Sequence, residues 1–188
     1  MDAALKKWIV QPRPELVAAV TSAVREHMAA LKSQGGEIYG YAILPGEPGD
    51  FSSLVAAYNG ESEIKVPSTD EQYNYYRYSV DEWEHYEDDR FDEVNTLLAD
   101  MNAQFETLHV KEAEADEFEL DDAEEAYANS LLKSILQGLE AARAEGVFGP
   151  KEPFVAIWIP DSDHDIIFKA VRRLNSAKVI REFMAEFG

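Results

Sequence analysis

Apolar positions in the first third of the chain follow a helical pattern and then a strand pattern. They recur every three or four residues from Val17 to Leu31, and this spacing predicts a helix over residues 14–34. The runs 37–44 and 52–58 are rich in aromatic and branched residues, which favour strands. About seven residues that include glycine and proline separate the two runs, so we expect an antiparallel pair of strands.

The middle of the chain combines aromatic, amphipathic and acidic segments. Residues 73–78 (YNYYRY) predict a strand from their propensity. Ser79 then has the position of a helix N-cap, with Glu82 as its capping-box partner. Apolar residues at helical spacing predict an amphipathic helix over residues 91–105. Residues 111–125 hold nine acids, which indicates a solvated loop.

The last third predicts a long helix, a buried strand and two more helices. The long helix is expected to end near Glu145, and the run 154–159 (FVAIWI) is apolar at every position. Such a run is typical of a central strand covered on both faces. Ser162 or Asp163 is expected to cap the next helix. Since the elements do not alternate as in a doubly wound fold, we predict an α+β fold (α/β mixed). It forms a single domain over residues 1–188, with one mainly antiparallel sheet of about four strands and helices packed on it.

The composition narrows the class of protein. With 46% hydrophobic residues, a chain of 188 residues can bury the core of one domain. It has no cysteine, which excludes disulfides, thiolate metal sites and cysteine nucleophiles. Its longest continuous apolar run, residues 154–159, is far shorter than a membrane span. We therefore expect a cytoplasmic protein that has no membrane contact.

The net charge of −20 is concentrated in one stretch. From Asp81 to Glu125 there are nineteen acids and two bases, whereas the rest of the chain is nearly neutral. A charge of this sign argues against nucleic acids and anionic membranes as partners. The stretch either keeps the protein soluble or forms an electrostatic face for a basic protein partner.

The residues expected to contact such a partner are all acidic. They are Asp88, Asp89, Glu112, Glu114, Asp116, Glu117 and Glu119. Five bases near the C-terminus allow another arrangement, in which they neutralise the acidic stretch within the protein or in a symmetric dimer. These bases are Lys169, Arg172, Arg173, Lys178 and Arg181. The oligomeric state stays open.

An arginine among tyrosines is the most distinctive local feature. Arg77 could hold a carboxylate in a two-point grip, with Tyr76 and Trp83 completing a pocket for an anion or an acidic peptide. The structural alternative pairs Arg77 with Glu82 or Glu84 while the aromatic rings pack under the sheet. We favour the structural alternative, because aromatic packing is the commoner use of such residues.

Alternating acids near the C-terminus are weak candidates for a metal site. Asp161, Asp163 and Asp165 could supply oxygen ligands to a hard cation such as calcium. The calcium loop of helix-loop-helix proteins needs a glycine after its third acid, but here Ile166 follows. Acids at a helix N-terminus explain the pattern more simply, so we predict no metal.

The sequence contains no catalytic constellation. None of the four histidines stands at metal-site spacing from another, and the chain has no P-loop, GxGxxG or GxSxG motif. His27 lies on the apolar side of the first predicted helix and is expected to be packed. His164 could act as an acid or base, but that role needs a nucleophile or ligand partner, which the sequence does not identify. We predict no catalytic residue and no cofactor.

The chain resembles a bacterial family, domain of unknown function 4303. The resemblance rests on the stretch Tyr75–Ser79 followed by Glu82 and Trp83, and on a later strand followed by Asp161–Asp163 and a helix ending at Leu174–Asn175. It implies a bacterial, cytoplasmic protein. It implies no activity.

These observations favour a binding protein over an enzyme. The first hypothesis is an acidic bacterial binding module, an immunity or regulatory protein that engages a basic protein partner. The immunity role is drawn by analogy with small acidic bacterial families that block toxins. The alternative is an enzyme or small-molecule sensor with a pocket around Arg77 and Trp83. The third possibility is a plain structural subunit, which a large apolar patch on the surface would indicate.

Overall fold

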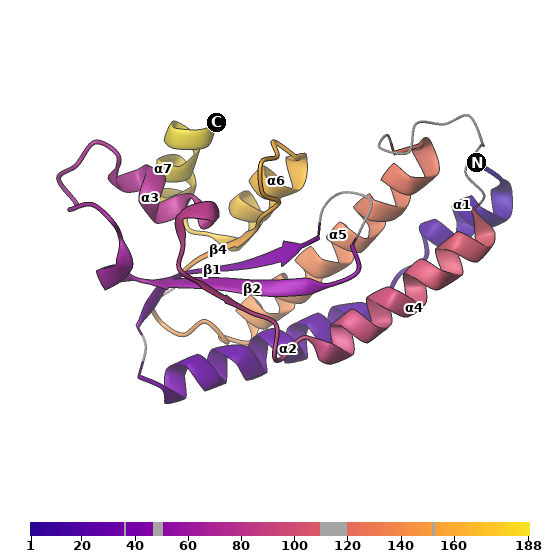
Figure 1. Cartoon of the computed structure of the whole chain (residues 1–188), viewed down its shortest axis with the longest axis horizontal. Helices are drawn as coiled ribbons and strands as arrows, with labels where there is room; N and C mark the ends of the chain where they lie inside the picture. The colour runs from indigo at the N-terminus through magenta and orange to yellow at the C-terminus, as the bar shows by residue number, and fades with distance from the viewer. Residues whose placement is uncertain (36, 47–50, 110–119, 152) are drawn as a thin grey trace.

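One mixed four-stranded sheet lies among helices in the structure (Figure 1), a computed structural model that describes residues 1–35, 37–46, 51–109, 120–151 and 153–188. The strands are β1 (Ile38–Pro45), β2 (Leu54–Gly60), β3 (His85–Glu87) and β4 (Phe154–Ile157). The helices are α1 (Ala3–Ile9), α2 (Pro14–Ser33), α3 (Tyr73–Tyr78), α4 (Asp92–Leu108), α5 (Asp122–Ala144), α6 (Asp165–Leu174) and α7 (Ala177–Phe187). Two 3₁₀ turns, η1 (Glu61–Glu63) and η2 (Val80–Glu82), flank α3.

The strand order β3-β2-β1-β4 confirms a predominantly antiparallel sheet. β1 pairs antiparallel with β2, and β2 pairs antiparallel with β3. The predicted hairpin of the first two strands is therefore present. β4 lies parallel to β1, so the sheet is mixed. Two neighbouring parallel strands need a long connection between them. The connection from β1 to β4 is long enough, because it includes β2, β3, α4 and α5.

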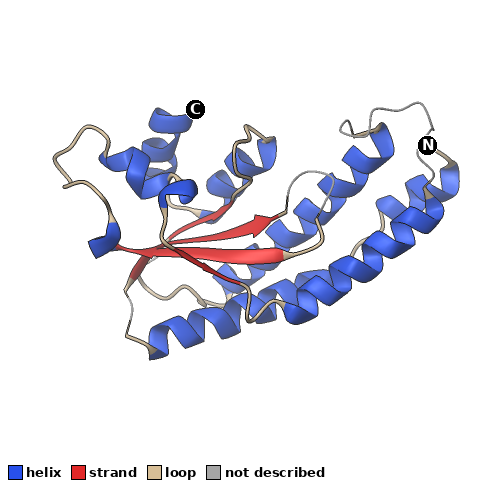
Figure 2. Ribbon diagram, in the orientation of Figure 1, coloured by secondary structure: helices blue, strands red, loops and turns tan. Residues whose placement is uncertain are grey.

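Helices cover both faces of the sheet (Figure 2). Along β1, Tyr41 points to the side of α2, where its hydroxyl lies 3.0 Å from a ring nitrogen of His27. Gly40 lies on the opposite face, beside the ring of Trp83. Because successive residues of a strand point to opposite faces, a doubly covered strand must be apolar on both. β4 meets this requirement, since all four of its residues are buried.

The three long helices α2, α4 and α5 run side by side and extend past one end of the sheet (Figure 1). α2 and α5 approach each other most closely at Gly138. The hydroxyl of Thr21 donates a hydrogen bond of 2.7 Å to the carbonyl of Val17, and it lies 3.2 Å from the carbonyl oxygen of Gly138. A side chain larger than hydrogen at position 138 would collide with Val20. The glycine thus sets the depth at which α2 lies against α5.

Residues 73–78 form α3, so the predicted strand is wrong. Helical spacing brings the guanidinium of Arg77 2.9 Å from the hydroxyl of Tyr73, four residues earlier. It also turns Tyr78 into the core, where its ring packs against Phe154 and Phe183. These tertiary contacts outweigh the strand propensity of the tyrosines.

Several predicted helix ends also need correction. Ser79 makes no side-chain cap, and the predicted helix after it is only the 3₁₀ turn η2. His164, rather than Ser162 or Asp163, caps α6. α5 begins inside the expected acidic loop, because Asp121 and Glu124 form a capping box at its N-terminus. The helix α1 and the strand β3 were not predicted at all.

The predicted acidic loop cannot be compared further, since residues 110–119 lie outside the described part of the chain. Within the described ranges, no helix combines the length and the apolar character that crossing a membrane requires.

Replacing Gly138 with alanine tests the α2–α5 contact. Helix propensity alone would favour alanine over glycine by about 1 kcal/mol. The new Cβ would lie 2.6 Å from a methyl group of Val20, and such overpacking typically costs about 1–3 kcal/mol. We expect Gly138→Ala to lower the free energy of unfolding in urea.

The control for propensity is Ala103→Gly, at an exposed position inside α4. It should lower the free energy of unfolding by about 1 kcal/mol, because no close contact opposes the intrinsic preference there. A Gly138→Ala protein more stable than wild type would contradict the close contact.

Candidate functional site

The guanidinium of Arg77 is held within the protein. Its nitrogens donate to the carboxylate of Glu61 at 2.7 and 2.8 Å, and the group stacks over the ring of Tyr39 at 4.6 Å. Burial opposes the charge, but the hydrogen bond and charge of Glu61 outweigh it and raise the pKa of Arg77. The same hydrogen bond lowers the pKa of Glu61. The predicted partners, Glu82 and Glu84, are wrong; Glu82 binds Lys65 instead.

Trp83 serves the core of the sheet. Its side chain is buried, and its ring atoms lie so close to β1 that a Cβ on Gly40 would be only 2.6 Å away. Its indole N–H lies 3.3 Å from the backbone carbonyl of Arg77, to which it donates. Trp83 therefore links the end of α3 to the sheet, which agrees with the structural interpretation of the motif.

Of the three residues predicted to form a ligand pocket, only Arg77 lines the cavity described beside it. A cavity of about 300 Å³ is lined by Arg77, with Tyr39 and Glu61, but neither Tyr76 nor Trp83 reaches it. The ring of Tyr76 instead lies 5.9 Å from the ammonium group of Lys65. The guanidinium of Arg77 already donates hydrogen bonds to Glu61 and Tyr73. A ligand pocket around Arg77 therefore stays a prediction that the geometry does not favour.

A buried polar cluster around His27 was missed by sequence reasoning. His27 is 2% exposed, as its packing role predicted, and its two ring nitrogens lie 3.0 Å from the hydroxyl of Tyr41 and 3.2 Å from the carboxylate of Glu87. The hydroxyl of Tyr58 donates to the other oxygen of Glu87 at 2.6 Å. The apolar side of the helix indicated that His27 is buried. Its partners depended on β3, which no sequence signal revealed.

Burial and charge set the protonation of this cluster. Burial lowers the pKa of His27, although its hydrogen bond to the carboxylate of Glu87 opposes the shift. The hydrogen bond from Tyr58 lowers the pKa of Glu87. Burial, with the neighbouring Glu87, raises the pKa of Tyr58 to about 12. The cluster thus holds a neutral imidazole beside a carboxylate and ties α2 to β1, β2 and β3.

The acids that lead into and lie along α4 form an exposed negative face. Asp88 and Asp89 are exposed in the turn before α4. α4 itself contains four acids and no lysine or arginine, and all four acids are exposed: Asp92, Glu93, Asp100 and Glu106. We call these six residues the acidic face. The other predicted contact residues lie outside the described part of the chain: Glu112, Glu114, Asp116, Glu117 and Glu119.

The C-terminal bases do not neutralise the acidic face in the described part of the chain. Arg173 binds Glu140 on α5, and Lys178 lies 3.7 Å from Glu182 on its own helix. Arg172 contacts the sulfur of Met184 at 3.7 Å. Among the described ion pairs, none joins a C-terminal base to the acidic face, as neutralisation within the protein would require.

Asp161 and Asp163 lie in the turn between β4 and α6, and Asp165 is the first residue of α6. Asp161, Asp163 and Asp165 are all exposed, and Asp161 has a positive φ of 52°. The described residues contain no group of three histidine, cysteine, aspartate or glutamate side chains placed to hold a metal. His164 instead accepts the backbone N–H of Ile166 at 3.1 Å, which gives the segment the role of a helix start.

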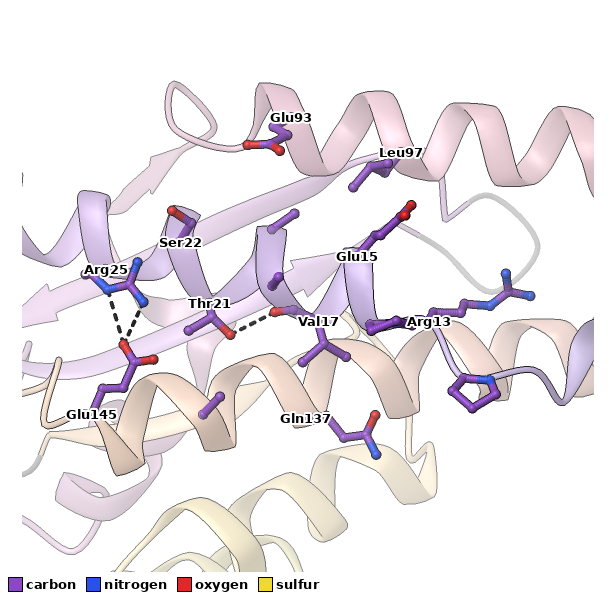
Figure 3. A pocket seen from close by; sticks show the side chains of 15 residues that line it. Arg13, Glu15, Val17, Thr21, Ser22, Arg25, Glu93, Leu97, Gln137 and Glu145 are labelled. Atoms are coloured by element: carbon purple, nitrogen blue, oxygen red, sulfur yellow. Dashed lines mark hydrogen bonds and ion pairs between the residues drawn. The ribbon is translucent and has the colours of Figure 1, made fainter.

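A groove along α2 completes the candidate features. It has a volume of about 940 Å³ and lies between α4 and α5, with residues of α2 between them (Figure 3). Glu93 and Leu97 of α4 line one side, and Gln137 of α5 and Glu145, the residue that follows α5, line the other. One member of the acidic face, Glu93, thus borders the groove. No sequence pattern indicated the groove, because it depends on the spacing of three helices.

A family model agrees with the sequence motifs. The model for the family described as domain of unknown function (DUF4303) matches residues 16–176. The chain belongs to this family. In this member of the family, the matched region contains the helices α2, α4 and α5 around the groove and the motif from Tyr75 to Trp83. Comparison with curated proteins and with solved structures found no match.

The His27 cluster makes the stability of this family member depend on pH. The folded pKa of His27 lies below its usual 6.5, so the unfolded chain binds more protons between these two values. The free energy of unfolding should therefore fall as the pH drops from 7 to 5, by at most about 1.4 kcal/mol per pH unit. We expect His27→Gln to reduce this dependence in urea denaturation at pH 7, 6 and 5, most clearly between pH 7 and 6, because carboxylates with lowered pKa such as Glu61 and Glu87 add a slope of the same sign nearer pH 5.

The control is Ala103→Gly, which lowers the free energy of unfolding without changing a titratable group and should keep the wild-type slope. A wild-type slope in the His27→Gln protein would show that the imidazole is not the group responsible.

Proposed function

We propose that this protein is an acidic protein-binding module whose acidic face engages a basic protein partner. The observation that carries the proposal is the unpaired state of this face. Its six acids are exposed, and none forms an ion pair among the described residues. Three of the C-terminal bases, Arg172, Arg173 and Lys178, contact other groups.

Electrostatics explains why such a face suits binding. Like charges on one helix repel each other, and no base on α4 relieves them. A partner with lysine and arginine side chains supplies the missing counter-charges and is attracted over a distance of about 10 Å at moderate ionic strength. Complementary charge mainly speeds encounter and excludes wrong partners. An unpaired acidic face therefore favours a regulated interaction over a merely soluble surface.

The biological setting extends this proposal. We infer a bacterial cytoplasmic protein with an immunity or regulatory role, by analogy with small acidic bacterial families that block toxins. The alternative, an enzyme or sensor with a pocket around Arg77 and Trp83, has less support, because the first residue is held by Glu61 and the second is buried in the core.

Charge reversal on the acidic face tests the proposal. A partner is recovered with the immobilised protein at 50 mM salt, identified and purified, and its affinity is measured at several salt concentrations. We expect the triple variant Asp88→Lys, Asp89→Lys and Asp100→Lys to bind the partner at least tenfold more weakly, about 1.4 kcal/mol, and with a smaller salt dependence.

The matched control reverses three exposed acids elsewhere, Glu26, Glu71 and Glu186, and has the same net charge. It should bind within threefold of wild type. Equal losses in both variants, or binding that ignores salt, would contradict a specific acidic face.

A further inference from the structure

The groove along α2 has a floor of small side chains and walls from two other helices. Val17, Ala18 and Ser22 of α2 line it, with Leu97 of α4 and Ala141 of α5 at its sides. In Figure 3, Leu97 descends from α4 toward α2, while the ribbon of α5 runs along the other side. Small residues between two raised helices leave room for one more helix to approach closely.

The close contact of α2 with α5 explains this shape. Gly138 lets α2 approach α5 so far that a Cβ there would touch Val20. α4 packs on the other flank of α2. Because an α-helix rises about 1.5 Å per residue, the lining of α2 from Pro14 to Arg25 covers about 17 Å of its axis. This length matches about three turns of a bound helix.

The charges around the groove are distributed unevenly. Glu93 on the α4 side and Glu15 on α2 are exposed, and neither has an ion-pair or hydrogen-bond partner among the described residues. Arg25 already has a partner, because its guanidinium binds the carboxylate of Glu145 at the C-terminal end of α5 at 2.6 Å (Figure 3). Arg13 also lines the groove, but its guanidinium stacks over Trp8 at 4.5 Å, and two of its nitrogens are buried there without a hydrogen-bond partner in the described part of the chain. An occupant therefore meets two exposed unpaired carboxylates, Glu93 on the α4 side and Glu15 on α2.

We propose that the groove binds a basic amphipathic helix of the partner, an inference that rests on the proposed function. Its apolar face packs on Ala18, Leu97 and Ala141. Lysines or arginines beside that face pair with Glu93 and Glu15. Recognition of a helix in a groove uses anchors spaced three or four residues apart, and it depends on their alignment on one face. The acidic face supplies attraction, and the groove supplies the shape.

Two synthetic peptides of about 18 residues test the groove directly. Both contain the same numbers of leucine and lysine, but one aligns its leucines on a single helical face and the other distributes them around the helix. Affinity is measured by fluorescence anisotropy at 50 and 300 mM salt. We expect the aligned peptide to bind at least tenfold more tightly. Equal affinities, or no binding of the aligned peptide, would overturn the groove as the site.

Substitutions locate the binding surface. Ala18→Trp fills the groove and should weaken the aligned peptide at least tenfold. Ala99→Trp adds the same side chain to an exposed position of α4 outside the groove lining, and it should change the affinity less than threefold. Glu93→Lys should weaken binding of the aligned peptide and reduce its salt dependence, whereas Glu186→Lys should do neither. Circular dichroism and urea denaturation confirm that each variant folds.

The outcomes separate the two proposals. If Ala99→Trp weakens binding and Ala18→Trp does not, the occupant lies on the outer side of α4, and the groove is wrong while the acidic face stands. If Ala18→Trp abolishes binding but neither salt nor Glu93→Lys affects it, the basic character of the occupant is wrong, and the proposed function loses its basis.

Discussion

The contact between α2 and α5 at Gly138 is the constraint on which the arrangement of the long helices depends. Without a side chain at this position, the helices approach until the hydroxyl of Thr21 lies 3.2 Å from the carbonyl of Gly138. This depth fixes α2 beneath the ridges formed by α4 and α5. It also places His27 on the same helix beside Tyr41 of the central strand. One glycine thus joins the groove at one part of α2 to the polar cluster at another.

The opposite face of the sheet is fixed by another glycine and a large aromatic ring. Gly40 leaves room for Trp83 against β1, and Trp83 in turn holds the end of α3 through its hydrogen bond to the carbonyl of Arg77. Arg77 then binds Glu61. The most distinctive motif of the sequence is therefore a joint between α3, the 3₁₀ turns and the sheet. A distinctive sequence pattern can arise from packing of this kind as readily as from a ligand site.

The sequence predicted those elements whose signal is local. Periodic apolar residues identified α2, α4 and α5, and the apolar run before Pro160 identified β4. The prediction for α3 was wrong, because the choice between helix and strand depended on a distant contact. The ring of Tyr78 packs against Phe154, which lies far along the chain. It missed the partners of His27, because β3 has only three residues. The groove could not be predicted, because it depends on the distances between three helices, and no local sequence pattern determines these distances.

Charge and shape give different kinds of information about a partner. Exposed acids attract any basic surface, and their effect weakens with salt, so a negative face alone selects a class of molecules and no particular one. A groove selects by the alignment of apolar groups, but without charge it would bind many amphipathic helices equally. Glu93 belongs to both features, since it is part of the acidic face and borders the groove. Where the acidic face meets the groove, the charge also fixes the orientation of the partner. A bound helix must turn its basic side to α4 and its apolar side to Ala18.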